Sequence, residues 1–179
     1  MIEPLTLKPV QVDWQSLWEA VIQRNHPYTH CDFLDTETGQ TIFLHEEVVG
    51  RIRNESAYVN RMLPPWVKED LPKARQVLAD KTGRYLLIPE PDSDEWYRAR
   101  LDFTCHPEVS MDMRLRLLDA LDGSGAFRRF QAVLRDAPQV RKCWDSFEKE
   151  WTLKWLHSWL RSVGIDAALP APNRRSKRR

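Results

Sequence analysis

The feature that most constrains this fold is a series of large apolar residues near the C-terminal end of the chain. From residue 140 to residue 159 they recur at steps of three, four or seven, which is the spacing of one helical face. The members of the series are Val140, Trp144, Phe147, Trp151, Trp155 and Trp159. Gly164 followed by Ile165 ends it, because glycine accepts the left-handed conformation that commonly follows a helix. The pattern predicts a helix over 140–163, roughly 36 Å long, with its indole face buried in the core.

Two short β-rich runs nearer the N-terminus predict a hairpin. Residues 28–34 and 40–44 are separated by a loop that contains Gly39, which can supply the positive φ that such a loop requires. Residues 84–88 form a third β-rich run that a proline stops. The sequence therefore predicts an α+β fold, in which a small antiparallel sheet (the hairpin plus a third strand) is packed by several helices.

Further helices are predicted from apolar periodicity and from capping signals. One is expected over 13–25, another over 45–60, and a short one within 66–81 that begins near Pro72. Asp92 with Glu95 three positions later is a capping-box pattern that starts a helix ending at Phe103, and Ser110 caps a helix ending at Leu121. The predicted buried row of that last helix is Leu115, Leu118 and Leu121.

Composition excludes several classes of protein. Of the 179 residues 42% are hydrophobic and 30% are charged, which is ordinary for one folded domain. No run approaches the roughly 18 apolar residues that a membrane span requires, and no secretory signal begins the chain, so we predict a cytoplasmic protein without membrane contact. Cys31, Cys105 and Cys143 are scattered and show no C-x-x-C spacing. They indicate cysteines that form no disulfide and are buried as small hydrophobic residues, and we predict neither a metal nor a cofactor.

The formal net charge of +1 conceals a basic end. Five of the 27 basic residues fall in the last six positions: Arg174, Arg175, Lys177, Arg178 and Arg179. We predict an irregular lead-in over 1–12, a single α+β domain over 13–166 and a disordered basic tail over 167–179. Such a tail can neutralise phosphates and release counterions. It indicates either contact with nucleic acid (non-specific), a ribonucleoprotein or an acidic protein surface, or a merely solubilising end.

One candidate site is the acidic group formed by Asp92, Asp94 and Glu95. Carboxylates in this density suit Mg²⁺ or Mn²⁺, and a pair of them suits acid–base work. Helix capping explains Asp92 and Glu95 without any ligand, because both can accept hydrogen bonds from the first helical turn. Capping is therefore the simpler interpretation.

A second candidate is the Gly123-Ser124-Gly125 turn with Arg128 and Arg129. A turn before a helix can bind an anion, and this is the best candidate anion site within the body of the chain. No G-K-[ST] ending accompanies it, so a helix–helix corner is the simpler interpretation. The predicted buried face of the helix that follows is Phe127, Phe130 and Leu134.

A third candidate lies on the hairpin. His30 and Asp32 share one face of the first strand, and His45 lies near His30 at the open end of the hairpin. Imidazole and carboxylate ligands of this kind can hold zinc. The usual ligand-pair signatures are missing, so solvated or hydrogen-bonded histidines are favoured. Likewise, the tryptophans of the 140–163 helix could stack on nucleic-acid bases, but their helical spacing favours burial.

Several short motifs, taken together, resemble one known family. They are Phe33-Leu34-Asp35 with Thr38-Gly39, Arg84-Tyr85 with Ile88-Pro89, the run from Asp92 to Tyr97, the run from Ala120 to Phe130, Trp144, Trp159-Leu160 and Gly164-Ile165. In order and spacing, over roughly residues 14–165, they resemble the bacterial uncharacterised protein family 0158. The resemblance implies one compact domain. It carries no assigned activity, so it implies no catalytic residue.

Three functional hypotheses follow. The chain has no G-x-S-x-G, H-E-x-x-H or S-x-x-K motif, so the leading hypothesis is a non-enzymatic binding or regulatory protein that engages a protein or nucleoprotein partner through its helical surface. The alternative is an enzyme acting on phosphorylated or nucleic-acid substrates, which requires Asp92, Asp94, Glu95, Arg128 and Arg129 to meet in one cleft. The third is a structural adaptor in an oligomer, recognisable by a large exposed apolar patch.

Overall fold

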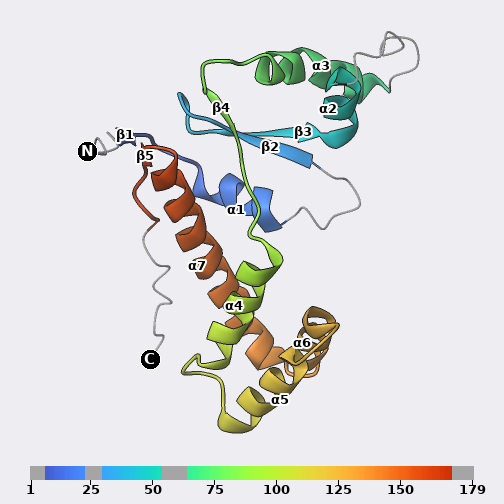
Figure 1. Cartoon of the computed structure of the whole chain (residues 1–179), viewed down its shortest axis with the longest axis vertical. Coiled ribbons are helices and arrows are strands. Elements are labelled where there is room, and N and C mark those ends of the chain that lie inside the picture. The colour runs from blue at the N-terminus through green and yellow to red at the C-terminus, as the bar shows by residue number, and fades with distance from the viewer. Residues whose placement is uncertain (1–6, 23–29, 54–63, 171–179) are drawn as a thin grey trace, which may run out of the picture. The chain divides into compact units, whose positions relative to one another are not determined.

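The computed structural model describes residues 7–22, 30–53 and 64–170 (Figure 1). Its contacts group into two compact units. The first, here the sheet unit, comprises Met1–Pro89 and Leu156–Arg179, and the second, here the helical unit, comprises Glu90–Trp155. The predicted single domain over 13–166 stays a prediction. The five cations of the predicted basic tail lie outside the described residues.

The sheet unit contains the predicted antiparallel sheet. Strands β2 (His30–Asp35), β3 (Thr41–His45) and β4 (Tyr85–Leu87) lie in the order β3-β2-β4, and both pairings are antiparallel. Phe33 of the central strand lies opposite Ile42 on one side and Leu87 on the other. The predicted hairpin with an added third strand is therefore confirmed, and so is the α+β class.

Three helices belong to the N-terminal part of this unit: α1 (Trp14–Ile22), α2 (Glu46–Arg53) and α3 (Pro65–Leu78). Helices α2 and α3 lie on one side of the sheet and α1 on the other (Figure 1). A buried cluster lies between the sheet and helices α2 and α3. Its members are Phe33, Leu44, Val48, Val49, Leu71, Ala74 and Val77. The residues that follow α1 and α2, over which longer helices are predicted, lie outside the described part of the chain.

Helix α3 begins seven residues earlier than predicted. Pro65 occupies its first turn, and Pro72 lies inside the helix. Proline is favoured at the first helical position because its fixed φ suits the helix and its missing N–H has no partner there anyway. The predicted start at Pro72 was wrong because Pro64-Pro65 supplies the same signal closer to the real boundary.

The lead-in, which the sequence predicts to be irregular over residues 1–12, contains a short strand. Strand β1 (Lys8–Pro9) pairs in parallel with β5 (Ile165–Asp166). The backbone N–H of Lys8 donates to the Gly164 carbonyl at 2.8 Å, and that of Val10 donates to the Asp166 carbonyl at 3.0 Å. No local pattern predicts this pairing, because its two partners are separated by most of the chain.

The predicted start of the disordered tail at residue 167 was also wrong. Ala167 is 2% exposed, and the carbonyl of Ala168 accepts a hydrogen bond from the Trp14 indole N–H at 2.8 Å. Ile165 is buried as well, so alternate residues after the last helix point inward, as on a strand. Residues 165–168 are therefore part of the folded sheet unit.

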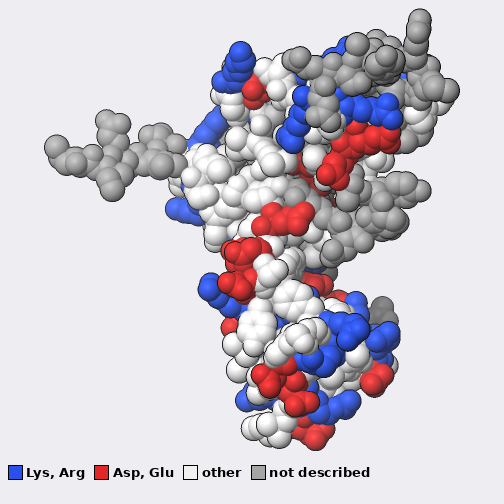
Figure 2. Space-filling model, turned by 45° about the vertical axis from the view of Figure 1, so that its right-hand side comes forward, with Lys and Arg blue, Asp and Glu red and all other residues white. Residues whose placement is uncertain are grey.

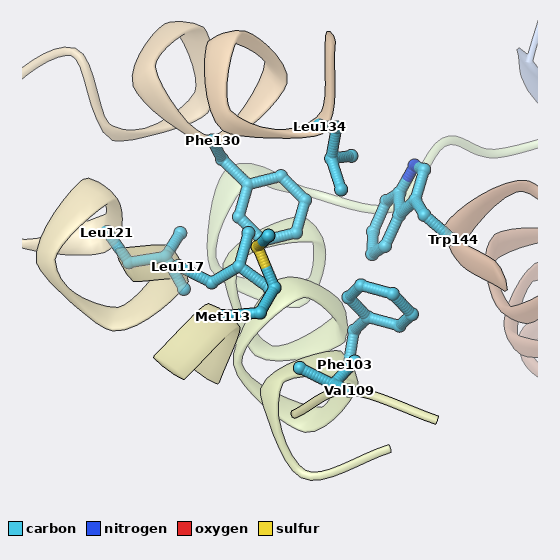
Figure 3. Packing of buried hydrophobic residues seen from close by; sticks show 8 residues of the cluster. All are labelled: Phe103, Val109, Met113, Leu117, Leu121, Phe130, Leu134 and Trp144. Carbon is cyan, nitrogen blue, oxygen red and sulfur yellow. The ribbon is translucent and has the colours of Figure 1, made fainter. Parts of the chain in front are cut away.

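The helical unit consists of α4 (Ser93–Thr104), α5 (Met111–Leu121), α6 (Ala126–Arg135) and α7 (Pro138–Ser162) as far as Trp155. Its helix starts follow the predicted signals. Asp92 and Glu95 form a complete capping box, and the Ser110 hydroxyl accepts from the backbone N–H of Met113. Figure 3 shows the side chains that these helices bury together: Phe103, Val109, Met113, Leu117, Leu121, Phe130, Leu134 and Trp144.

The predicted buried row of α5 was wrong in two of its three members. Leu115 is 61% exposed and Leu118 is 37% exposed, whereas Leu121 is buried. The buried face is formed by Met113, Leu117, Ala120 and Leu121. Helix α5 is apolar on two sides, so periodicity alone could not decide which side meets the core.

The predicted indole row of α7 is buried only in part. Trp144 is fully buried, whereas Trp151, Trp155 and Trp159 are half-buried. The fully buried positions of the later turns are Thr152, Leu156 and Leu160. At about 100° per residue, the second row is displaced by roughly a quarter turn from the first. The buried face of α7 therefore turns around the helix along its length.

The predicted burial of the three cysteines was wrong. Cys105 is exposed, and Cys31 and Cys143 are half-buried. Cys105 follows the last residue of α4 at the C-cap, so it lies outside the face that this helix buries.

Candidate functional site

The acidic group at the start of α4 stabilises the N-terminus of that helix. The backbone N–H of Glu95 donates to Asp92 Oδ1 at 2.8 Å, and the backbone N–H of Asp92 donates to Glu95 Oε2 at 2.9 Å. Glu95 Oε1 accepts from the indole N–H of Trp155 at 2.7 Å. Asp94 is exposed in the first turn, where a negative charge complements the helix dipole. Capping and the contact with α7 thus use both oxygens of Glu95.

The two arginines at the start of α6 differ in their contacts. Arg129 donates to the backbone carbonyl of Ala120 at 3.1 Å, and its guanidinium also donates to the carbonyls of Asp122 and Ser124. It therefore satisfies carbonyl groups at the end of α5 and in the turn that follows. Arg128 is exposed. The predicted anion site retains only one of its two arginines facing solvent.

The carboxylates and the arginines of the enzyme hypothesis make different contacts in the structure. The carboxylates contact the first turn of α4 and α7, whereas Arg129 contacts the end of α5 and the turn before α6. Figure 2 shows, over the described residues of the face it draws, acidic and basic side chains with uncharged surface between them. A charged cleft of the kind that concentrates phosphorylated substrates would carry one sign of charge.

A buried arginine is the residue that sequence reasoning missed. Arg100 is 8% exposed, and its guanidinium lies 4.1 Å from the ring centroid of Phe127 and 5.5 Å from that of Trp144. Its Nη1 donates to the Trp96 carbonyl at 2.7 Å. Burial lowers the pKa of Arg100, and the nearby Glu148 carboxylate opposes that shift. Burial likewise raises the pKa of Glu148, against the effect of Arg100.

This arrangement joins three helices rather than opening a site. The aromatic faces attract the cation where water is excluded, and they come from α4, α6 and α7. The guanidinium is largely enclosed by these rings. Its position within α4 gave no signal in the sequence, because arginine is ordinarily assigned to the surface.

A second charged group is the ion pair of Asp35 with Arg84, which links the hairpin of the sheet unit to the residue before β4. Asp35 is 4% exposed, and Arg84 donates to both of its oxygens, from Nε at 3.0 Å and from Nη2 at 2.8 Å. Arg84 Nη1 also lies 2.7 Å from Glu37 Oε2. The hydrogen bonds from Arg84 lower the pKa of Asp35 to about 2, although burial opposes the shift. This pairing gives the Phe33-Leu34-Asp35 and Arg84-Tyr85 motifs a structural role.

Replacing Asp35 with asparagine should lower the free energy of unfolding by about 2 kcal/mol at pH 7, because a bidentate charged hydrogen bond is lost at a buried position. The pKa of Asp35 in the folded protein lies below its ordinary value of 3.8. The stabilisation is therefore complete above pH 3.8 and disappears as the pH falls through about 2. Urea unfolding of both proteins at several pH values measures the difference. Glu37→Gln is the control, with an expected change below about 0.5 kcal/mol; an equal loss in both variants would contradict the assignment.

The predicted histidine candidate is a cross-strand pair. His30 lies opposite His45, and their ring centroids are 4.6 Å apart. Asp32, on the same face of β2, is buried. Among the residues described, no three or more histidine, cysteine, aspartate or glutamate side chains are grouped so as to hold a metal ion. A structural zinc site ordinarily needs four ligands, so the pair does not make one.

The exposed side of α5 carries apolar side chains that take no part in the core of the helical unit. Met111 is 65% exposed, Leu115 is 61% exposed and Leu118 is 37% exposed. These three residues, spaced by four and then three, form one stripe along the helix and are here called the α5 apolar row. On the adjoining helix α4, Tyr97 and Leu101 are also exposed. Helix α5 has more apolar residues than one buried face requires. This excess is the feature of the sequence that could have indicated the α5 apolar row.

The comparisons with known proteins identify a family. The model of the Uncharacterised protein family (UPF0158) matches residues 64–174, which is more than half of the chain. The chain belongs to this family. No curated protein and no solved structure matches it.

The UPF0158 match includes the whole helical unit and therefore the α5 apolar row. It confirms the predicted family over that segment, whereas the hairpin motifs before residue 64 lie outside it. In the part of the chain that the structure describes, none of the helices combines the length and the apolar character needed to cross a bilayer.

Proposed function

We propose that this UPF0158 member is a non-enzymatic binding or regulatory protein of the cytoplasm, and that it engages a protein partner, alone or within a nucleoprotein, through the helical unit. The observation that carries the proposal is the α5 apolar row. Clustered apolar side chains on a protein surface mark interaction sites more often than singly scattered ones do.

Helix α5 is built to serve two surfaces at once. Its inner face, which includes Met113 and Leu117, is buried in the core of the helical unit. Its outer row places apolar side chains at positions i, i+4 and i+7, which is the pattern that helix-in-groove recognition uses. Fully burying one leucine side chain is worth roughly 1.5–3 kcal/mol. Because the side chains of the row are 37–65% exposed, their burial against a partner supplies only part of this value each, and it favours binding without fixing an affinity.

The contacts of the charged candidates support binding over catalysis. Glu95 is occupied by capping and by Trp155, and Arg129 is occupied by backbone carbonyls. A general acid or a phosphate-binding arginine must face its substrate. We further propose that the basic residues within 174–179 add non-specific attraction to nucleic acid, because clustered cations release counterions from phosphates.

Leu115→Gln should reduce recovery of the partner from a native lysate about tenfold, because it removes the most exposed leucine of the row. The free energy of unfolding should change by less than about 0.5 kcal/mol, since the side chain lies outside the core. Quantitative affinity purification with the full chain, before and after nuclease treatment, measures the effect. A partner that survives nuclease is bound as a protein, and one lost with nuclease is bound within a nucleoprotein.

Val163→Gln is the matched control, because it removes another exposed apolar side chain at a position outside α5. Its recovery of the partner should equal that of the unchanged chain. If Leu115→Gln and the unchanged chain recover the same proteins in the same amounts, the row is not the binding surface.

A further inference from the structure

The charges beside the α5 apolar row limit what can cover it. Asp112 and Asp119 lie three residues before and four residues after Leu115, so both flank the row on the same side of the helix. Asp122 follows at the C-terminal end. All three are exposed, and like charges facing a partner must be complemented by it.

The two basic residues of α5 offset this acidic rim only in part. Arg114 flanks the opposite side of the row, but it is half-buried, and its Nε donates to the Thr104 carbonyl at 2.8 Å. Arg116 is exposed and, four residues after Asp112 and three before Asp119, lies next to both aspartates on the side away from the row. The exposed charges nearest the row are therefore the carboxylates of Asp112 and Asp119, since Arg114, which is equally near, is half-buried.

A second copy of this chain fits the row poorly. If two α5 helices paired antiparallel about Leu115, Asp112 of one copy would lie beside Asp119 of the other, which is a like-charge contact. A parallel pairing would bring the acidic flank against Arg114, whose guanidinium is already used by Thr104. Self-association thus gains apolar burial but gives the rim a weaker complement than exposed cations would, because Arg114 is half-buried.

We propose that the α5 apolar row binds a basic amphipathic helix of another protein, with apolar side chains spaced by three and four residues and with lysine or arginine beside them. The proposal rests on the protein-binding function proposed above and names the chemistry of the partner. The apolar side chains would cover Met111, Leu115 and Leu118, and the cations would face Asp112 and Asp119.

The test uses the full chain and three synthetic helical peptides that share one apolar face and differ in the flanking residues, which are lysine, glutamine or glutamate. Fluorescence anisotropy gives the dissociation constants at low and at physiological salt. The lysine peptide should bind about fivefold more tightly than the glutamine peptide, as two surface ion pairs predict, and more tightly still than the glutamate peptide. The preference should shrink as salt rises.

Two variants separate the parts of the proposal. Leu115→Gln should weaken all three peptides, and the double change Asp112→Asn and Asp119→Asn should abolish the preference for lysine while leaving the glutamine peptide unaffected. Peptide binding that remains in Leu115→Gln measures attraction by charges elsewhere in the chain. Subtracting it gives the contribution of the α5 apolar row.

The outcomes distinguish the two proposals. Binding that depends on Leu115 but shows no preference, or favours glutamate, overturns the basic partner and leaves the protein-binding function standing. A lysine preference that survives the double aspartate change also overturns it. No Leu115-dependent binding to any peptide overturns both. Dimerisation in sedimentation experiments that Leu115→Gln abolishes makes a second copy the occupant and likewise overturns the basic partner.

Discussion

Phe103→Ala is expected to lower the free energy of unfolding by about 4 kcal/mol, as large-to-small changes of a fully buried aromatic residue do. Phe103 is 0% exposed. Its ring centroid lies 5.2 Å from that of Trp144 and 6.3 Å from that of Phe130, both at edge-on angles. Figure 3 shows the three rings turned toward one another at the centre of the helical unit. Alanine would leave a cavity between α4, α6 and α7 that these rings cannot fill.

Chemical denaturation followed by tryptophan fluorescence measures this loss, because Trp144 reports directly on the same core. Leu101→Ala is the matched control. It lies on the same helix two positions earlier and is 40% exposed, so its expected cost is below about 1 kcal/mol. Equal losses in the two variants would mean that the helical unit is not held together at Phe103.

Gly39→Ala is expected to cost about 3 kcal/mol, for two separate reasons. Its φ of +73° is one that side chains rarely adopt, and a Cβ at this position would lie 1.9 Å from the Gln11 carbonyl oxygen. That oxygen belongs to backbone, so the clash can be relieved only by moving the lead-in away from the hairpin. The movement would also break the hydrogen bond from the Asp13 N–H to the Gly39 carbonyl, which is 3.1 Å long.

Gly83→Ala isolates the clash from the backbone strain. Gly83 has a similar φ of +78°, but a Cβ there would meet no atom within 4 Å. Its expected cost is only the positive-φ penalty, about 1 kcal/mol. Thermal or urea unfolding of both variants gives the difference. If the two glycine changes cost the same, the lead-in does not pack against the hairpin turn in solution.

The sequence by itself determined the elements whose causes lie within a few residues. The hairpin around Gly39, the capping box of Asp92 and Glu95, and the helix end at Gly164 each depend on backbone groups that are satisfied locally. The existence of a long final helix also followed, because a periodic apolar series has one regular conformation that gathers it on a face.

The tertiary structure decided everything that needed a choice between equivalent local options. Periodicity shows that a helix has apolar sides but not which side meets the core, and so Leu115 was assigned to the wrong one. It treats charge as surface, and so it could not place Arg100 among aromatic rings or turn Arg129 toward carbonyl groups. The pairing of β1 with β5 joins segments that no local rule relates. In each case the deciding energy comes from residues distant in sequence, because burial is a property of the packed chain and not of any segment alone.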